Sequence, residues 1–214
     1  MNFLILAANG QIARIVENRI LSEDNFQDIN LTLGLRTPHR LCLLEPKARM
    51  MEVDLNNNQA VNKAMYKQNI VFVNVIDHTK DNIITKNVIK AMKINHVSRV
   101  IFANILGIYN EVGGEFGRWN HQFVMPGLKA AINADKLLAR SGLHYTTLRL
   151  PWLNDHNEIK YSITTHNEPY IGVSGSRKSI ADAILKIVRN PALYDNDSIG
   201  IADPDTQGKD RPVY

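Results

Sequence analysis

The chain has 214 residues, one cysteine, 44% apolar and 21% charged residues, and a formal net charge of +4. This composition excludes collagen-like, coiled-coil and disordered proteins, and the single Cys42 excludes an internal disulfide or a cysteine zinc site and fits a reducing compartment. The 25 basic residues are scattered, and no apolar run approaches the ~18 residues of a membrane span. We therefore expect a cytoplasmic protein, a monomer or a homodimer, with no nucleic-acid partner, no membrane insertion and no metal.

Short apolar segments, which are typical of buried strands, alternate with segments whose apolar residues recur at helical spacing. The predicted strands are Phe3–Ala8, Asn30–Arg36, Met50–Leu55, Asn69–Ile76, Arg99–Asn104 and His144–Leu150. The predicted helices are Gln11–Leu21, Asn58–Met65, Asp81–Asn95, Pro126–Ser141 and Ser179–Arg189, and the Gly-rich stretch Gly113–Trp119 is predicted to be a loop.

This alternation predicts an α/β fold, a doubly wound parallel sheet of the Rossmann type with helices on both faces. The sequence after Trp152 is less regular and contains one further predicted helix, which indicates a small C-terminal elaboration. We expect a single domain over residues 1–214, with a nucleotide-binding core to about residue 150 and a smaller segment, 151–214, that completes a pocket.

The first turn reads Ala7-Ala8-Asn9-Gly10-Gln11-Ile12-Ala13, directly after the first predicted strand and at the start of the first predicted helix. Dinucleotide-binding folds need small residues here, because the backbone turns tightly and approaches a pyrophosphate at the helix N-terminus. The pattern is A-x-x-G-x-x-A, in which only Gly10 is kept as glycine. The alternative is a strand–turn–helix that binds nothing.

Arg36 ends the second predicted strand, 23 residues after Ala13. NAD sites place an acidic residue here for the ribose 2′-hydroxyl, whereas a guanidinium pairs with the 2′-phosphate of NADP, and Arg40 is a second candidate for that contact. A bound dinucleotide would therefore be NADP(H) rather than NAD(H); the alternative is an ordinary exposed arginine. Asp54, after the third strand, borders an adenine or caps the next helix.

Six segments of the chain carry a family resemblance. They are AANGQIA, LTLGLR, VDL, VSRVIFANILGIYNE, ADKLLARSGLHYTTLRLPWL and VSGSRKSIADAI. Together they resemble the atypical short-chain dehydrogenase/reductases with an NmrA-like or NAD(P)H-binding domain, from Phe3 to about Pro191 and most specifically over residues 141–149. The resemblance implies a Rossmann-type fold, binding of NADP(H) or NAD(H) and, in many members, reduction of a small electrophile, a quinone or a flavin.

The resemblance also implies where a cofactor would lie. The implied cofactor-binding residues are Ala7, Asn9, Gly10, Gln11 and Ile12 at the phosphate turn, Arg36 at the 2′-phosphate, Asp54 and Leu55 beside the adenine, Asn74 near its ribose, Ala103 with Asn104 under the nicotinamide ribose, and Pro151, Trp152 and Leu153 over the nicotinamide.

The catalytic pair of the short-chain dehydrogenases is missing. That pair is Tyr-x-x-x-Lys, in which the lysine lowers the tyrosine pKa and the tyrosine donates a proton during hydride transfer. None of the seven tyrosines has a lysine four residues later. The remaining candidates are Tyr109 as proton donor, Asn104 at a strand end and Lys129 as a ribose ligand. A loop aromatic and a solvated helix lysine are the simpler explanations for Tyr109 and Lys129.

Three functions remain open. The first is an NADP(H)-dependent reductase of a small electron acceptor, since hydride transfer to a quinone or flavin depends mainly on positioning. The second is a non-catalytic redox sensor that binds NADP and docks a partner protein, which the missing catalytic pair favours. The third, an epimerase or dehydratase, is disfavoured because the C-terminal segment is short. Trp119 and Trp152 offer a flat apolar wall for a ring-shaped acceptor, or simply pack.

Overall fold

The computed structural model describes residues 1–39 and 47–214, so the candidate Arg40 and the single Cys42 lie outside the described residues. Within them, the central sheet has the strand order β3-β2-β1-β4-β5-β6-β10-β8. These strands are β1 (Asn2–Leu6), β2 (Asn30–Leu35), β3 (Arg49–Glu52), β4 (Ile70–Val73), β5 (Arg99–Ile105), β6 (His144–Leu150), β8 (Ser162–Thr164) and β10 (Asp197–Ala202). Every pairing is parallel except that of β8 with β10.

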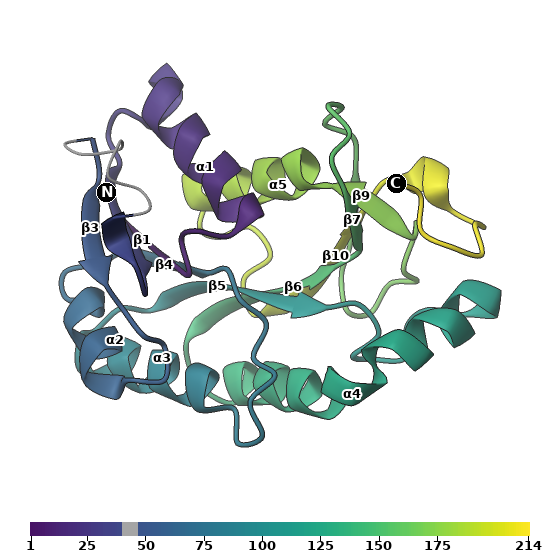
Figure 1. Ribbon diagram of the computed structural model, residues 1–214, viewed down its shortest axis with the longest axis horizontal. Coiled ribbons are helices and arrows are strands. Elements are labelled where there is room, and N and C mark those ends of the chain that lie inside the picture. The colour runs from purple at the N-terminus through teal and green to yellow at the C-terminus, as the bar shows by residue number, and fades with distance from the viewer. Residues whose placement is uncertain (40–46) are drawn as a thin grey trace.

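The helices form two layers, one on each face of the sheet (Figure 1). The first layer contains α1 (Gln11–Ser22) and α5 (Arg177–Arg189), and the second contains α2 (Asn58–Met65), α3 (Ile83–Ile94) and α4 (Gly114–Ala139). None of the helices in residues 1–39 and 47–214 combines the length and the apolar character that crossing a bilayer requires. The predicted doubly wound α/β fold is thus confirmed.

The alternation of side chains along β1 explains why both layers pack. Phe3 and Ile5 belong to the core under α1 and α5, whereas Leu4 and Leu6 belong to the core under α2 and α3, and all four are fully buried. A strand covered on both faces has to be apolar where it is buried, as Phe3, Leu4, Ile5 and Leu6 are.

The topology fixes where a ligand can bind. From β1 the chain first builds outward through β2 and β3, and then crosses to the other side of β1 to form β4, β5 and β6. The order therefore reverses between β1 and β4, and in open α/β sheets ligands bind beyond the carboxyl ends of the strands at this point.

The predicted loop Gly113–Trp119 is wrong, because α4 begins at Gly114 and continues through Pro126. The sequence suggested a helix start at Pro126, where proline is favoured in the first turn. Gly114 and Gly117 in the first turn of α4 made the sequence resemble a loop. Gly117 is required by packing, because a Cβ on it would lie 2.1 Å from the Val112 carbonyl oxygen.

The segment after Trp152 is more ordered than the sequence indicates. Besides the predicted helix it forms β8 and β10 of the main sheet and a two-stranded parallel sheet of β7 (Trp152–Asn154) and β9 (Ser174–Ser176). Strand β10 escapes prediction because it contains Asp197 and Gly200, which are typical of turns. Gly200 is needed because the Tyr170 ring lies 2.4 Å from the position of a Cβ.

Candidate functional site

A cavity of about 720 Å³ opens at the carboxyl ends of β1, β2, β3 and β4, beside the point where the strand order reverses. Its lining residues are Ala7, Asn9, Gly10, Leu35, Arg36, Thr37, Val53, Asp54, Leu55, Asn56, Asn74, Val75 and Ile84. They come from the ends of the four strands β1, β2, β3 and β4 and from one residue of α3, so the cavity is formed by the fold as a whole and not by one loop.

The turn after β1 is tight, and its small residues are required by close contacts. Ala7 adopts a left-handed conformation with φ of 57°, and the Gly10 amide donates to the Ala7 carbonyl over 3.1 Å. A Cβ on Gly10 would lie 2.1 Å from Nδ2 of Asn74. Gly10 therefore allows the Asn74 amide to lie against the turn, where it also approaches the Ala7 carbonyl at 3.5 Å.

The N-terminus of α1 faces this cavity without a side-chain cap. Gly10 is the N-cap, no side chain accepts a hydrogen bond there, and the first turn of the helix contains no acidic residue. The amides of Gln11, Ile12 and Ala13 have no carbonyl partner within the helix, and the helix dipole adds partial positive charge. Such an end binds phosphate oxygens.

Arg36 supplies the positive side chain of the cavity. It lies at the end of β2, is exposed, and pairs with no carboxylate among residues 1–39 and 47–214. Asp54 is the acidic residue of the lining, and its Oδ1 accepts from the backbone amide and the side-chain amide of Asn56 at 3.0 and 3.2 Å. The guanidinium therefore remains available to an anionic ligand.

Seven of the predicted cofactor-binding residues line the cavity. They are Ala7, Asn9, Gly10, Arg36, Asp54, Leu55 and Asn74. Gln11 and Ile12 directly follow Gly10 but are not among the lining residues, and the Ile12 side chain is buried in the core. Thr37 and Val75 also line the cavity, and the sequence analysis did not name them. Their positions at the ends of strands could have predicted this.

The remaining predicted cofactor residues lie at or near the carboxyl ends of the next strands, β5 and β6. Ala103 is buried in β5 and Pro151 is buried after β6. Leu153 packs against the core under α1 and α5. Trp152 is half-buried, and its indole Nε1 donates to Oδ1 of Asn120 over 2.9 Å.

Aromatic side chains of α4 gather against Trp152. The Trp119 ring centre lies 4.6 Å from that of Trp152 and 4.4 Å from that of Phe123. A second cavity of about 390 Å³ lies beside them, lined by His78, Ile105, Phe123, Val124, Pro126 and Gly127. This half of the edge is therefore apolar and partly aromatic.

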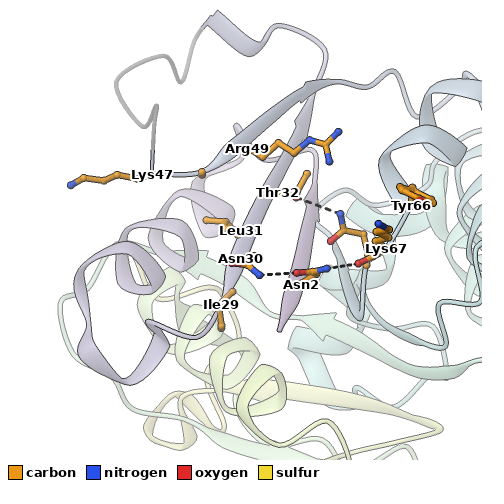
Figure 2. A pocket seen from close by; sticks show the side chains of 11 residues that line it. Asn2, Ile29, Asn30, Leu31, Thr32, Lys47, Arg49, Tyr66 and Lys67 are labelled. Carbon is orange, nitrogen blue, oxygen red and sulfur yellow. Dashed lines mark hydrogen bonds between the residues drawn. The ribbon is translucent and has the colours of Figure 1, made fainter.

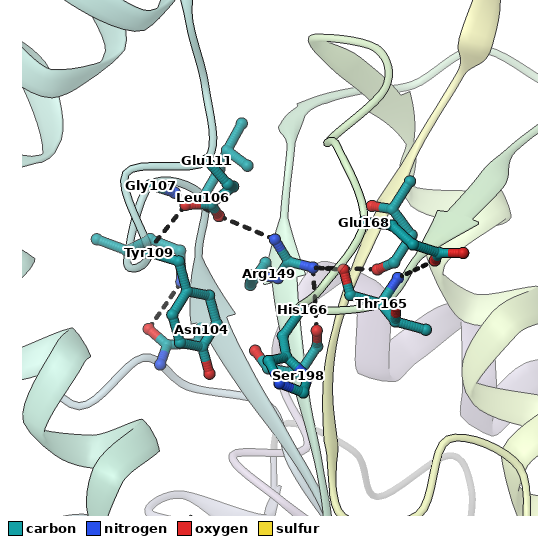
Figure 3. A network of polar contacts seen from close by, with 12 residues as sticks. Asn104, Leu106, Gly107, Tyr109, Glu111, Arg149, Thr165, His166, Glu168 and Ser198 are labelled. Carbon is teal, nitrogen blue, oxygen red and sulfur yellow. Dashed lines mark hydrogen bonds and ion pairs between the residues drawn. The ribbon is translucent and has the colours of Figure 1, made fainter.

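A buried ion pair holds the loop after β5, as Figure 3 shows. Arg149 of β6 has no exposed surface, and its Nη1 lies 3.2 Å from Oε1 of Glu111. The Arg149 Nη2 group donates to the carbonyls of Thr164, Thr165 and Ser198, each at 3.0 Å. Pairing and hydrogen bonding offset the cost of burying this charge.

Glu111 completes the same network by accepting from the amides of Gly107 and Tyr109 at 3.0 and 2.9 Å. The Tyr109 ring lies over the guanidinium of Arg149 at 5.5 Å. The sequence did not predict this network, and the one signal for it is an arginine inside the buried strand His144–Leu150.

The three catalytic candidates have distinct surroundings. The Tyr109 hydroxyl donates to Oδ2 of the buried Asp135 over 2.5 Å, and burial together with this bond raises the pKa of the tyrosine. Both polar atoms of the Asn104 side chain are occupied: Nδ2 donates to the Ala131 carbonyl at 3.0 Å and Oδ1 accepts from the Ile105 amide. Lys129 is exposed on α4.

A further pocket of about 500 Å³ lies at the opposite end of the strands (Figure 2). It is lined by the first residues of β1, β2 and β3 together with Tyr66 and Lys67, which follow the C-terminus of α2. A helix C-terminus carries partial negative charge, and this pocket has no helix N-terminus in its lining. The pocket is lined by Lys47, Arg49 and Lys67, but the carboxyl-edge cavity alone of these two adds a helix N-terminus for a phosphorylated ligand.

The donors of that cavity fit a dinucleotide. Unpaired amides at the start of α1 suit a diphosphate, Arg36 suits a further anionic group, and the buried Leu55 offers an apolar contact for a base. A doubly wound sheet with this turn and cavity defines a dinucleotide-binding protein of the Rossmann class.

Comparison with known proteins agrees with this class. The family model described as NAD(P)H-binding matches residues 7–191. No curated protein matches the chain. A solved Rossmann-fold NAD(P)-binding family protein from Shigella flexneri is 36% identical, with a TM-score of 0.80, and the match covers 100% of this chain and 98% of that one. The chain therefore belongs to the NAD(P)H-binding family.

Two more distant structures share the fold. A short-chain dehydrogenase/reductase from Veillonella parvula DSM 2008, solved in complex with NADP, is 23% identical with a TM-score of 0.90, covering 100% of this chain and 99% of that one. An anaerobillin reductase from Escherichia coli O157:H7 is 17% identical with a TM-score of 0.81, covering 98% of this chain and 100% of that one.

Proposed function

We propose that this protein is a cytoplasmic reductase that prefers NADP(H) and reduces a small planar acceptor such as a quinone or a flavin. The observation that carries the cofactor preference is Arg36, which lines the carboxyl-edge cavity at the end of β2 and pairs with no carboxylate among the described residues. An acidic residue at this place would repel a 2′-phosphate, whereas a guanidinium binds it through charge-assisted hydrogen bonds.

Specific groups would hold the cofactor. The first-turn amides of α1 would bind the diphosphate, Leu55 and Asp54 would border the adenine, and Asn74 would lie near its ribose. The Veillonella parvula neighbour was solved with NADP on the same fold, which supports this choice of cofactor. Ala103, Pro151, Trp152 and Leu153 would follow along the edge toward the nicotinamide.

The cofactor, when bound, supplies a hydride. What this chain contributes is a place for the acceptor, because the apolar cavity of His78, Ile105 and Phe123 adjoins the aromatic cluster of Trp119 and Trp152. Flat aromatic side chains stack on ring systems and exclude water from them. The Escherichia coli neighbour is named as a reductase, which supports a reductive role on this fold.

Proton delivery has a secondary place in this proposal. Tyr109 is the proposed donor if the acceptor needs a proton in the rate-determining step, and Lys129 would then contact a ribose hydroxyl. The Tyr109 hydroxyl already donates a hydrogen bond to Asp135. This bond would have to break before Tyr109 could donate its proton to the acceptor. Asn104 would act through position, since its side chain joins the end of β5 to α4.

One observation favours the second candidate, a redox sensor that binds NADP without turnover. Neither Tyr109 nor Asn104 presents a free proton donor, because both side chains are engaged in internal hydrogen bonds. Measuring NADPH consumption with a panel of quinones and flavins separates the two functions. Turnover well above the rate without enzyme supports the reductase, and binding of NADPH without any turnover supports the sensor.

The acceptor site has its own test. Phe123→Ala removes an aromatic wall that is 58% exposed, so the fold is little affected. We expect the KM for the acceptor to rise several-fold, while the Kd for NADPH stays unchanged, because stacking is worth ~1 kcal/mol. Tyr66→Ala is the matched control, with a residue that is 59% exposed and lies at the opposite end of the strands. Equal effects of both variants would remove Phe123 from the acceptor site.

A further inference from the structure

The outer surface of α3 and α4 gathers cations that look scattered in the sequence. On α3, Lys86, Lys90 and Lys93 follow one another at helical spacings of four and three residues, so they lie on one face. On α4 and its C-cap, Lys129, Lys136 and Arg140 follow at spacings of seven and four. All six are exposed. We call these six residues the basic face.

The two rows belong to neighbouring helices on the same side of the sheet (Figure 1). Nδ2 of Asn82, at the N-cap of α3, donates to the Ala130 carbonyl of α4 over 2.8 Å. A groove of about 320 Å³ between the helices is lined by Lys86, Lys136 and Arg140 together with Lys80. The rows therefore form one surface.

Carboxylates are scarce on this surface. None of the six cations forms an ion pair within residues 1–39 and 47–214. Helix α3 contains no Asp or Glu, and Asp81 is the one carboxylate among the residues that line the groove. Asp135 of α4 is buried and accepts from Tyr109.

The opposite helix layer shows that this is a local property. There Arg19 pairs with Glu23 and Asp182 at 2.5 and 2.9 Å, and Arg189 pairs with Asp28 at 2.7 Å. Most cations on α1 and α5 are thus paired with carboxylates, whereas those of the basic face generate an uncompensated positive potential that attracts anions.

We propose that the basic face binds an acidic surface of another protein. Charge complementarity steers such encounters and selects the partner. Ile83 and Ile94 of α3 are 39% and 53% exposed beside the lysines, and apolar side chains among charges are typical of protein interfaces. A second copy of this chain does not fit, because an isologous contact brings like charges together.

A nucleic acid fits this surface less well. The rows extend only about 10 Å along α3 and about 16 Å along α4. None of the residues that line the groove is aromatic, whereas surfaces for single strands stack bases on aromatic rings.

The test measures fluorescence anisotropy of a labelled peptide of alternating glutamate and leucine, with the full chain as receptor. We expect saturable binding that weakens steeply between about 50 and 200 mM salt. The triple variant Lys86→Glu, Lys136→Glu and Arg140→Glu should bind roughly tenfold more weakly or not at all.

The matched control is the triple variant Lys47→Glu, Arg49→Glu and Lys67→Glu. It changes the net charge by the same amount, at exposed residues around the pocket at the amino ends of β1, β2 and β3. It should keep the affinity of the native chain. Equal losses in both triple variants would mean that only net charge acts, and would overturn the proposal. So would an absence of peptide binding at low salt, or tighter binding of duplex DNA than of the peptide.

A second measurement needs no variant. Acetylation rates of individual lysines, read by mass spectrometry with and without the peptide, should fall several-fold at Lys86 and Lys136. They should stay unchanged at Lys47 and Lys67. Equal protection of all four lysines would contradict a defined surface.

Discussion

The two halves of the sheet's carboxyl edge are built on different principles. At β1, β2 and β3 two sets of hydrogen-bond donors are left without partners: the first-turn amides of α1 are uncapped and Arg36 forms no ion pair among the described residues. At β5 and β6 the polar groups bind one another: Arg149 forms an ion pair with Glu111, and Tyr109 donates a hydrogen bond to Asp135. What remains exposed there is aromatic and apolar.

This difference separates binding from chemistry. A surface with free donors holds an anionic cofactor, and a surface whose polar groups are already satisfied shapes a cavity without supplying an acid or a base. Such a pair of halves suits a reaction in which the cofactor carries the reactive group and the protein provides alignment. A substitution in one half should therefore leave the other half intact.

The largest effect is expected for Arg149→Met, which acts on the second half. Removing the guanidinium leaves the Glu111 carboxylate, whose side chain is 7% exposed, without its cation. Breaking a buried pair in this way costs about 3–5 kcal/mol. Urea unfolding measures the free energy, with Arg118→Met, an exposed arginine paired with Glu115, as the control that costs under ~1 kcal/mol. Similar losses in both variants would refute a special role for the buried pair.

Helix α1, which follows β1, contains a buried titratable residue, Glu17. It has no exposed surface, neither carboxylate oxygen accepts a hydrogen bond among the described residues, and Arg14 lies 3.8 Å away. Burial raises the pKa of Glu17 to about 7, partly opposed by the charge of Arg14. The folded protein therefore binds this proton more tightly than the unfolded chain does.

Stability should accordingly fall as pH rises from about 4.5 to about 7, because the unfolded chain releases the proton first, and should level off above that range. This contribution amounts to ~3 kcal/mol. In Glu17→Gln it should be absent, so the difference in stability between variant and native protein should grow through this range. Parallel pH profiles of the two proteins, measured by urea unfolding, would show that Glu17 is not held protonated.

The variant Tyr109→Phe tests whether the second half donates a proton to the electron acceptor. If alignment alone governs the rate, the turnover number should fall by less than about threefold, because general acid catalysis contributes roughly 100-fold or more where it operates. The assay is NADPH oxidation with the best acceptor of the quinone and flavin panel, measured across pH. A fall beyond 100-fold together with a changed pH profile would make Tyr109 the proton donor and blur the contrast between the halves.

Ala7→Gly should produce the smallest effect, in the first half. Ala7 has a φ of 57°, and a left-handed conformation costs an L-residue about 1–2 kcal/mol. Glycine removes this strain but gives the unfolded chain more freedom, so we expect a net gain of about 0.5–1 kcal/mol in the free energy of unfolding. The melting temperature measures it, and Ala8→Gly, at a residue without positive φ, should lower stability instead. A loss for Ala7→Gly would mean that the alanine methyl group is needed.

The sequence predicted the first half better than the second. Strands such as Phe3–Ala8 are readable because burial on both faces demands apolar residues, and the turn at Gly10 is local in sequence. By contrast, Arg149 and Glu111 are 38 residues apart, so only the fold brings them together. The start of α4 was hidden by Gly113, Gly114 and Gly117, because glycine is disfavoured inside helices and only the fold shows that Gly117 packs against the Val112 carbonyl.

The same reasoning explains the basic face. Its cations are spread from Lys86 to Arg140 and form no run, so the sequence gives no sign of a patch. Helical spacing aligns the cations within each helix, and the contact between α3 and α4 then brings the two rows side by side. Charge patterning across two elements is a tertiary property, and it becomes visible only once their packing is known.

The most direct test of the cofactor assignment compares the Kd values of NADPH and NADH, measured by calorimetry, in the native protein, in Arg36→Ala and in Arg49→Ala. Arg49 is an exposed arginine on the adjoining strand that does not line the cavity. We predict that the native protein and Arg49→Ala prefer NADPH by about 10- to 100-fold, the value of charge-assisted hydrogen bonds to one phosphate, and that Arg36→Ala loses this preference. Equal affinities for the two cofactors in the native protein, or an unchanged preference in Arg36→Ala, would contradict the account.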